Sequence, residues 1–181
     1  PGNQAERFDR LFIACHSDQA LAMLRDATPQ EREILGAIPY QHNEVVLHTD
    51  TSLLPRSRLA WSSWNYHRLA GDNAGVAVTY NMNLLQGLQT QQTFLVTLNN
   101  SPAIDPDKII RRLNYDHPVF TPGGIAAQQR QAEINGTRHT YYCGAYWRYG
   151  FHEDGVVSAL TALDHFRENN EHAQLPLQRA S

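Results

Sequence analysis

The two ends of the chain share one order of segments, in which a short apolar run leads into the start of a helix. Residues 10–15 are almost wholly apolar and are followed by Ser17 and Asp18, which are residue types that cap helices. Residues 140–146 form a second strand-like run, and residues 154–169 carry apolar side chains at helical spacing after a glycine-bounded loop. A buried strand entering a helix at each end is typical of an α/β domain that is interrupted by an insertion.

The region between these ends has the texture of antiparallel β-structure. Four β-rich stretches, at residues 43–49, 58–66, 75–81 and 93–99, are separated by clusters of Gly, Asn, Asp and Pro. Before them, Thr28, Pro29 and Glu31 form the pattern of a capping box, which predicts a helix to about Ile38. Residues 84–88 and 123–134 are helix-like, whereas the type of residues 108–120 stays open.

These patterns predict an α+β fold. We expect a mostly antiparallel β substrate domain at residues 39–135, carried by strand–helix units at residues 1–38 and 136–170 that belong to an interrupted, Rossmann-like domain. Residues 171–181 form a polar tail that we expect to be frayed.

Composition and charge exclude several classes of protein. The net charge is −3 and the 15 basic residues, with Lys108 the single lysine, are scattered, so we expect no nucleic-acid partner. No apolar run reaches the roughly 20 residues of a membrane-spanning helix, and the N-terminus lacks the pattern of a secretory signal, so we expect a cytoplasmic protein without a membrane span.

The residues that usually build metal sites and hydrolase sites do not form the required patterns. Cys15 and Cys143 lie in short apolar runs, which predicts two buried thiols and no disulfide framework. The nine histidines show no metal-ligand spacing, so no metal is expected. A Gly-x-Ser-x-Gly nucleophile turn is also absent from the sequence.

Residues 141–156 are the segment best suited to chemistry, because an apolar strand there runs through a glycine-rich loop into a helix N-terminus. Backbone N–H groups and the positive end of the helix dipole meet at such a point and stabilise an electron-rich group, such as a phosphate or the pyrimidine carbonyl of a reduced flavin. Spacing alone leaves open a second interpretation, in which Gly144, Gly150 and Gly155 serve only a turn and a helix start.

The same segment resembles the closing motif of flavin-dependent amine oxidases, in which an acidic-Gly-small triplet, here Asp154-Gly155-Val156, opens the last helix. The acid that often follows the first glycine of that motif is Ala145 here. The resemblance implies FAD as the cofactor, and in the opening run at residues 8–16 it implies that Ala14 lies close to FAD. It assigns the remaining cofactor contacts to Gly144, Ala145, His152, Glu153, Asp154, Gly155 and Val156.

Further segments resemble a bacterial family of predicted NAD/FAD-binding, amine-oxidase-like proteins that are associated with modification of unusual fatty acids. The resemblance runs to about Phe166 and rests on residues 16–21, Tyr40, Asn43, and residues 47–50, 61–66 and 150–155. That family begins with a Gly-x-Gly-x-x-Gly turn, which this sequence lacks. We therefore expect a C-terminal fragment whose partner is a missing N-terminal FAD-binding portion and which is inactive alone. Lys108 does not match the lysine motif of amine oxidases.

The resemblance implies a small-molecule or acyl-lipid substrate, and aromatic residues are candidates to line its pocket. Trp64, Tyr66, Trp147 and Phe151 are the substrate-lining candidates, with core packing as the alternative for each. Two other functions stay open: a noncatalytic lipid-binding or assembly module, and a flavin-dependent desaturase or isomerase, since relatives of this fold also act on carotenoids and porphyrinogens. No catalytic acid or base is assigned.

Overall fold

The computed structural model describes residues 5–69 and 76–173, which form two compact units. Unit 1 comprises Pro1–Tyr40 and Pro118–Ser181, and unit 2 comprises Gln41–His117. The fold is α+β with an antiparallel sheet, as the sequence predicts. The chain enters unit 2 through β2 (Tyr40–His48) and leaves it through β6 (Ile109–Pro118).

Unit 1 is built on a parallel pair of strands that joins the two ends of the chain. Strand β1 (Leu11–Ile13) pairs with β7 (Thr140–Tyr142), with Leu11 opposite Thr140 and Ile13 opposite Tyr142. The helices of this unit are α1 (Ser17–Met23), α2 (Pro29–Gly36), α4 (Pro122–Gln128), α5 (Gln131–Ile134) and α6 (His152–Ala173). A parallel sheet needs cover on both faces, which is why helices account for most of this unit.

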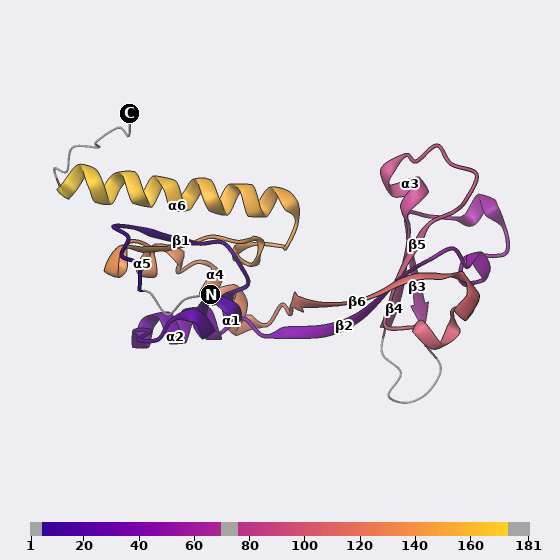
Figure 1. The fold of residues 1–181 in the computed structure, drawn as a ribbon, viewed down its shortest axis with the longest axis horizontal. Coiled ribbons are helices and arrows are strands. Elements are labelled where there is room, and N and C mark those ends of the chain that lie inside the picture. Colours follow the sequence, from indigo (N-terminus) through magenta and orange to yellow (C-terminus); the bar gives the residue numbers. More distant parts are fainter. Residues whose placement is uncertain (1–4, 70–75, 174–181) are drawn as a thin grey trace. The chain divides into compact units, whose positions relative to one another are not determined.

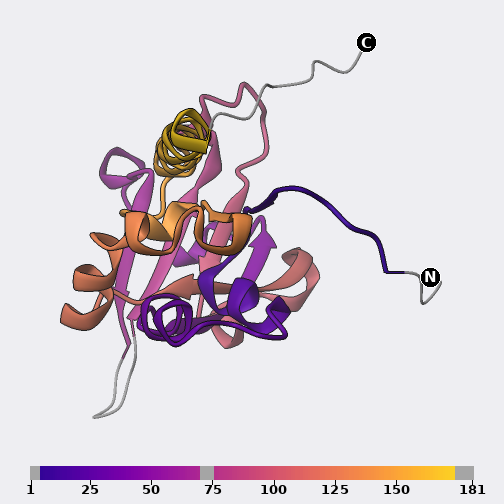
Figure 2. The same cartoon turned by 90° about the vertical axis from the view of Figure 1, so that its left-hand side faces the viewer.

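Successive side chains of β7 point to opposite faces of the strand pair, so the core of unit 1 has two layers. Tyr142 lies in a cluster with Ile13 and with Ile34 of α2, whereas Tyr141 and Cys143 contact Ala162 of α6. Helix α6 therefore covers one face of the strand pair, and the other helices lie on the opposite side (Figure 1; Figure 2, in which α6 is seen nearly end-on).

The capping box predicted at residues 28–31 is present at the start of α2. The side chain of Thr28 accepts the N–H of Glu31 at 3.1 Å, and Glu31 Oε2 accepts the N–H of Thr28 at 2.7 Å. Glu31 is buried, and its other oxygen accepts the hydroxyl of Tyr142 at 2.6 Å. The cap thus ties α2 to β7.

Unit 2 is a five-stranded sheet in the order β3-β4-β5-β2-β6. Strands β3 (Trp64–Arg68), β4 (Val76–Asn81) and β5 (Leu95–Leu98) form antiparallel pairs, and β5 pairs antiparallel with β2. The short helix α3 (Met82–Gln86) follows β4. The remaining one-turn helices of this unit are η1 (Thr51–Leu53), η2 (Arg58–Ala60), η3 (Ser101–Ala103) and η4 (Pro106–Lys108).

Several boundaries differ from those expected from the sequence. The strand expected at residues 58–66 is wrong in its first half, because Arg58–Ala60 is a one-turn helix and the strand begins at Trp64. Side chains hold this turn: the Trp61 indole donates to the carbonyl of Pro55 at 2.8 Å, and the Asn65 amide donates to that of Ser62 at 2.7 Å. Residues 108–120, whose type the sequence left undecided, contain strand β6.

The expected domain limit at residue 135 also differs from the structure. Residues 118–135 belong to unit 1, because Ala127 and Ile134 are buried in its core together with Ile34. The helix expected at residues 123–134 is broken into α4 and α5 around Arg130, whose φ of −108° and ψ of 15° are not helical. Of the expected frayed tail, residues 174–181 lie outside the described residues, while α6 continues to Ala173.

Asp50 anchors two loops of unit 2 and gives the protein an acid-sensitive contact. It accepts the N–H groups of Ser52 and Asp105, at 3.1 and 2.9 Å, and contacts Lys108 Nζ at 3.2 Å. Burial alone would raise the pKa of Asp50, but these donors outweigh it and lower the pKa from 3.8 to about 2. The carboxylate is 2% exposed.

We predict that Asp50 makes the protein less stable in acid. Because its pKa is lower in the folded protein, its contribution is complete above the ordinary pKa of 3.8 and is lost as the pH falls through about 2. Denaturant titration across this pH range should show a loss on the order of 1–2 kcal/mol that is absent in Asp50→Asn. Asp107→Asn, at an exposed position of η4, is the control and should retain the wild-type slope. An equal slope in Asp50→Asn would contradict the assignment.

Candidate functional site

The carboxyl ends of β1 and β7 lie side by side, and the segments that follow them form the candidate site. Because the strands are parallel, both chains turn away at the same edge, and the N–H of Cys143 extends the pairing by donating to the carbonyl of Ile13 at 3.0 Å. We call this place the carboxyl edge: residues 14–16, residues 143–145 and the first turn of α6. Ligands of α/β sheets bind at the carboxyl ends of parallel strands.

Close packing within the chain leaves no room for a side chain at position 144 of the carboxyl edge, so this position requires glycine. Its φ is 157°, and a Cβ atom there would lie 2.5 Å from the ring of Tyr146 and 3.2 Å from the carbonyl oxygen of Cys15. Its N–H donates to Ser158 Oγ at 2.8 Å, and that hydroxyl donates to the carbonyl of Gly155 at 2.8 Å. Gly144 therefore lets the end of β7, the segment after β1 and the start of α6 approach one another.

Asp154 fixes the beginning of α6. Its buried carboxylate accepts the N–H of Phe151 at 3.0 Å and lies 3.6 Å from Nε of Arg148. The amide of Gln128 holds the preceding loop by donating to the carbonyls of Tyr146 and Arg148, at 2.8 and 2.7 Å. Asp154 is thus engaged with its own chain, which gives the acidic residue of the triplet a capping role.

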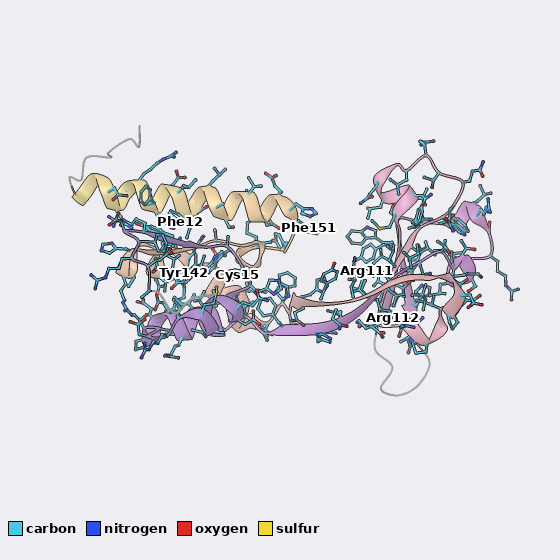
Figure 3. All side chains as sticks on the ribbon, viewed as in Figure 1. Phe12, Cys15, Arg111, Arg112, Tyr142 and Phe151 are labelled. Carbon is cyan, nitrogen blue, oxygen red and sulfur yellow. The ribbon has the colours of Figure 1, made fainter. Side chains whose placement is uncertain are left out.

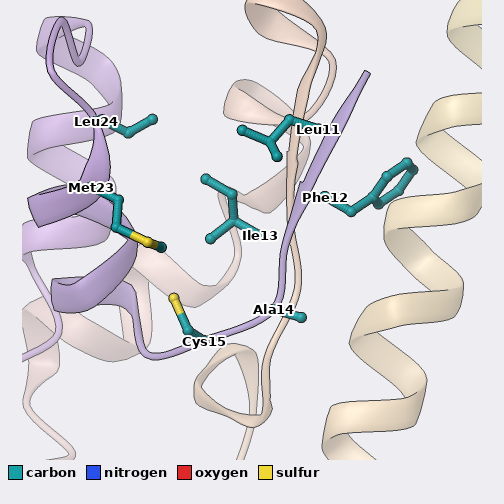
Figure 4. Close-up of a pocket in the computed structure, with 7 residues that line it drawn as sticks. All are labelled: Leu11, Phe12, Ile13, Ala14, Cys15, Met23 and Leu24. Atoms are coloured by element: carbon teal, nitrogen blue, oxygen red, sulfur yellow. The ribbon is translucent and has the colours of Figure 1, made fainter. Parts of the chain in front are cut away.

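A mostly apolar cavity of about 300 Å³ adjoins the carboxyl edge between β1 and α1. Ile13, Cys15 and Met23 converge on it, whereas Phe12 points the other way, toward α6 (Figure 4). Burial raises the pKa of the Cys15 thiol, which therefore stays protonated at neutral pH. The remaining residues that line the cavity are Leu11, Phe12, Ala14 and Leu24.

The structure brings the cofactor candidates of unit 1 together around the carboxyl edge. Ala14 follows β1, and Phe151 lies exposed at the start of α6 (Figure 3). Trp147 is 4% exposed and belongs to the core of unit 1, although it also borders a cavity of about 450 Å³ with Phe120 and Tyr149. Gly144, Ala145 and Gly155 are half-buried, Asp154 is buried, and His152, Glu153 and Val156 are exposed.

The two aromatic candidates of unit 2 lie on edge strand β3. Trp64 and Tyr66 share one face of this strand and are 57% and 67% exposed. They line a cavity of about 450 Å³ together with Leu53, Leu54, Pro55, Asn65 and His67.

Sequence reasoning gave no site role to three aromatic side chains at or beside the carboxyl edge, which are His16, Tyr40 and Tyr146. The ring of His16 stacks on that of Tyr40 with centroids 4.7 Å apart, and the Tyr40 hydroxyl accepts the N–H of Ser17 at 2.9 Å. Burial raises the pKa of Tyr146, so its phenol stays neutral. Among the described residues, Nδ1 of His16 is buried and has no hydrogen-bond partner. The one sequence signal for a site role of His16 was its position directly after the apolar run at residues 10–15.

The carboxyl edge offers a buried polar atom and an open helix start to a bound group. Nδ1 of His16, which is buried without a partner among the described residues, calls for a ligand or water to satisfy it. A Cβ atom added to Gly155, in the first turn of α6, would meet no atom within 4 Å, so that side of the helix is open. Within the described ranges, no group of three or more His, Cys, Asp or Glu side chains could hold a metal ion.

A membrane-spanning helix is not found among residues 5–69 and 76–173, since none there is both long and apolar enough.

Comparison with known proteins supports the fold. The sequence matches no family model, and it matches no curated protein. The structure is similar to the crystal structure of a protein named "Putative protoporphyrinogen oxidase" from Exiguobacterium sp. 255-15, with a TM-score of 0.50 and 13% sequence identity. The match covers 90% of this chain and 41% of the other. The chain therefore shares the fold of part of that protein and spans about two fifths of its length.

Proposed function

We propose that this chain is the C-terminal portion of an FAD-dependent oxidoreductase of the amine-oxidase type, and that its carboxyl edge forms one wall of the flavin site. The observation that carries the proposal is the parallel pairing of β1 with β7, which joins the two ends of the chain and places the Gly144 turn and the start of α6 at one edge. The fold likeness to a protein named as an oxidase supports it.

The proposed wall would act through orientation and electrostatics. Helix α6 has 22 residues, and its N-terminal end carries a partial positive charge that stabilises negative charge placed against it. Asp154 and Gln128 hold the loop before α6 in place, so the backbone N–H dipoles at the start of α6 are already oriented before a ligand binds. When bound, FAD would supply hydride acceptance, while the carboxyl edge would contribute contacts from Ala14, Gly144, Ala145, His152, Glu153, Gly155 and Val156.

The sheet of unit 1 supports the proposal that a further portion of the protein completes the site. Within the described residues this sheet has two strands, so one edge of β1 has no strand partner among them and could pair with a further strand. Leu11 and Phe12 of β1 are 46% and 39% exposed, although strands of parallel sheets are normally buried. A strand from an N-terminal FAD-binding portion, placed beside β1, would cover these side chains.

The proposed substrate is a small molecule or an acyl chain. In unit 1 the candidate lining residue is Phe151, and in unit 2 the candidates are Trp64 and Tyr66. All three are large, exposed aromatic side chains, which is the type that lines apolar ligand pockets. Trp147 is a weaker candidate, because most of its surface is used in the core of unit 1.

The proposal is tested by producing the full-length natural protein that contains this chain and measuring bound flavin. We expect a purified protein with flavin absorbance and quenched flavin fluorescence, whereas residues 1–181 alone should bind FAD weakly or not at all. Anaerobic bleaching by an acyl lipid, a porphyrinogen or an amine would then identify the substrate class. Absence of bound flavin in the full-length protein, even with excess FAD, would contradict the proposal and favour a noncatalytic module.

A further inference from the structure

Four side chains form a continuous hydrogen-bonded chain across four neighbouring strands of unit 2. His48 Nε2 on β2 lies 2.7 Å from Thr97 Oγ1 on β5, and this hydroxyl lies 2.8 Å from Thr79 Oγ1 on β4. Thr79 Oγ1 lies 3.1 Å from Nε2 of His67 on edge strand β3. His48, Thr79 and Thr97 are 0% exposed, and His67 is half-buried. We call these residues the His–Thr chain.

A backbone amide fixes the direction of the His–Thr chain. The N–H of Asp50 donates to Nδ1 of His48 at 3.1 Å, and since an amide N–H can only donate, Nδ1 carries no proton. Neutral His48 must then carry its proton on Nε2 and donate it to Thr97. With one hydrogen per hydroxyl, Thr97 donates to Thr79, and Thr79 donates to Nε2 of His67. Neutral His67 is thereby held with its proton on Nδ1.

Protonation disrupts this arrangement at either end. A proton on Nε2 of His67 makes this nitrogen a donor to Thr79, so the Thr79 hydroxyl turns and donates to Thr97. Thr97 then accepts from both His48 and Thr79, and its own buried hydroxyl proton has no other acceptor among the described residues. A proton on Nδ1 of His48 faces the N–H of Asp50, which loses its acceptor. The charged group that acts on His48 is Asp50, which itself contacts Lys108 and the N–H of Asp105. Neither histidine of the chain forms an ion pair with a described residue.

We propose that the His–Thr chain is a proton-controlled tie between β2 and the edge strand β3, intact while Nε2 of His67 carries no proton and interrupted when that atom takes one up. Burial lowers the pKa of His48 below its ordinary value of 6.5, which agrees with a neutral His48 in the folded protein. Below that value the unfolded chain binds a proton at His48 that the folded protein does not, so acid lowers the free energy of unfolding. Interruption of the chain frees β3 from this side-chain tie, and β3 carries Trp64 and Tyr66, which line the cavity of about 450 Å³ in unit 2.

Nitrogen-15 NMR of the histidine rings tests the proposal directly at neutral pH. We expect His48 with its proton on Nε2 and His67 with its proton on Nδ1, the less common form of free imidazole. Thr79→Ser, which retains the hydroxyl that donates to Nε2 of His67, should preserve both signals. Thr79→Val, which removes this donor, should lose the Nδ1–H signal of His67 in favour of Nε2–H.

Acidification of the wild-type protein provides the second readout. We expect the Nδ1–H form of His67 to be replaced by the doubly protonated ring, and the side-chain signals of Thr79 and Thr97 to shift with it. An Nε2–H tautomer at His67 in the neutral wild-type protein, or protonation of His67 that leaves the signals of Thr79 and Thr97 unchanged, would overturn the proposal. Both readings need no variant, so a Thr79→Val protein that fails to fold leaves the test decisive.

Discussion

Replacing Gly144 with alanine is expected to lower the free energy of unfolding by about 2–4 kcal/mol, because the added methyl group has no room. It would lie 2.5 Å from the ring of Tyr146, which is 3% exposed and cannot move aside. Denaturant titration of the two proteins measures the loss.

Gly155→Ala is the matched control for this substitution, eleven residues along the chain. A Cβ atom there meets nothing within 4 Å, and the position is inside α6, so alanine should be neutral or stabilising by up to about 1 kcal/mol. Equal effects of the two substitutions would show that the close approach at Gly144 is not present in the protein.

Replacing Glu31 with alanine is expected to cost about 2–4 kcal/mol, because one buried carboxylate serves two parts of unit 1. The substitution removes the acceptor of the Thr28 N–H and leaves the hydroxyl of Tyr142 buried without its partner. Both thermal and denaturant unfolding should report the loss, and Tyr142→Phe should show a smaller one.

Glu33→Ala provides the comparison within the same helix. Glu33 is exposed and pairs with Arg130 at the surface, so its removal should cost less than about 1 kcal/mol. If Glu31→Ala were no more destabilising than Glu33→Ala, the tie between α2 and β7 would be absent.

Features governed by local sequence could be predicted, whereas those that depend on distant partners could not. The capping box at Thr28 and Glu31 lies within four residues and is confirmed. The hydroxyl that the same Glu31 binds belongs to Tyr142, 111 residues away, and no local pattern indicates such a partner. The strand expected at residues 58–66 failed for a similar reason, since hydrogen bonds of Trp61 and Asn65 override β propensity there.

The sequence could indicate which segments would lie together, but not the contacts between them. It singled out residues 141–156, and in the structure Gly144 and the start of α6 in this segment lie at the carboxyl edge. The sequence could not show that Gly144 is required by Tyr146 and Cys15, or that Asp154 caps its own helix. It also could not distinguish Trp147, which is mostly core, from the exposed Phe151, because both are aromatic residues in one short loop.

Flavin content of a variant at Gly155 tests the central claim most directly. Because the space beside Gly155 is open, Gly155→Leu should leave the fold intact, yet its side chain would occupy the place proposed for the flavin. Gly123→Leu is the matched control, since Gly123 is also an early helical glycine whose Cβ atom would meet nothing within 4 Å. In the full-length protein, we predict that Gly155→Leu loses bound flavin while Gly123→Leu retains it. Full flavin content in folded Gly155→Leu protein would contradict a flavin wall at the carboxyl edge.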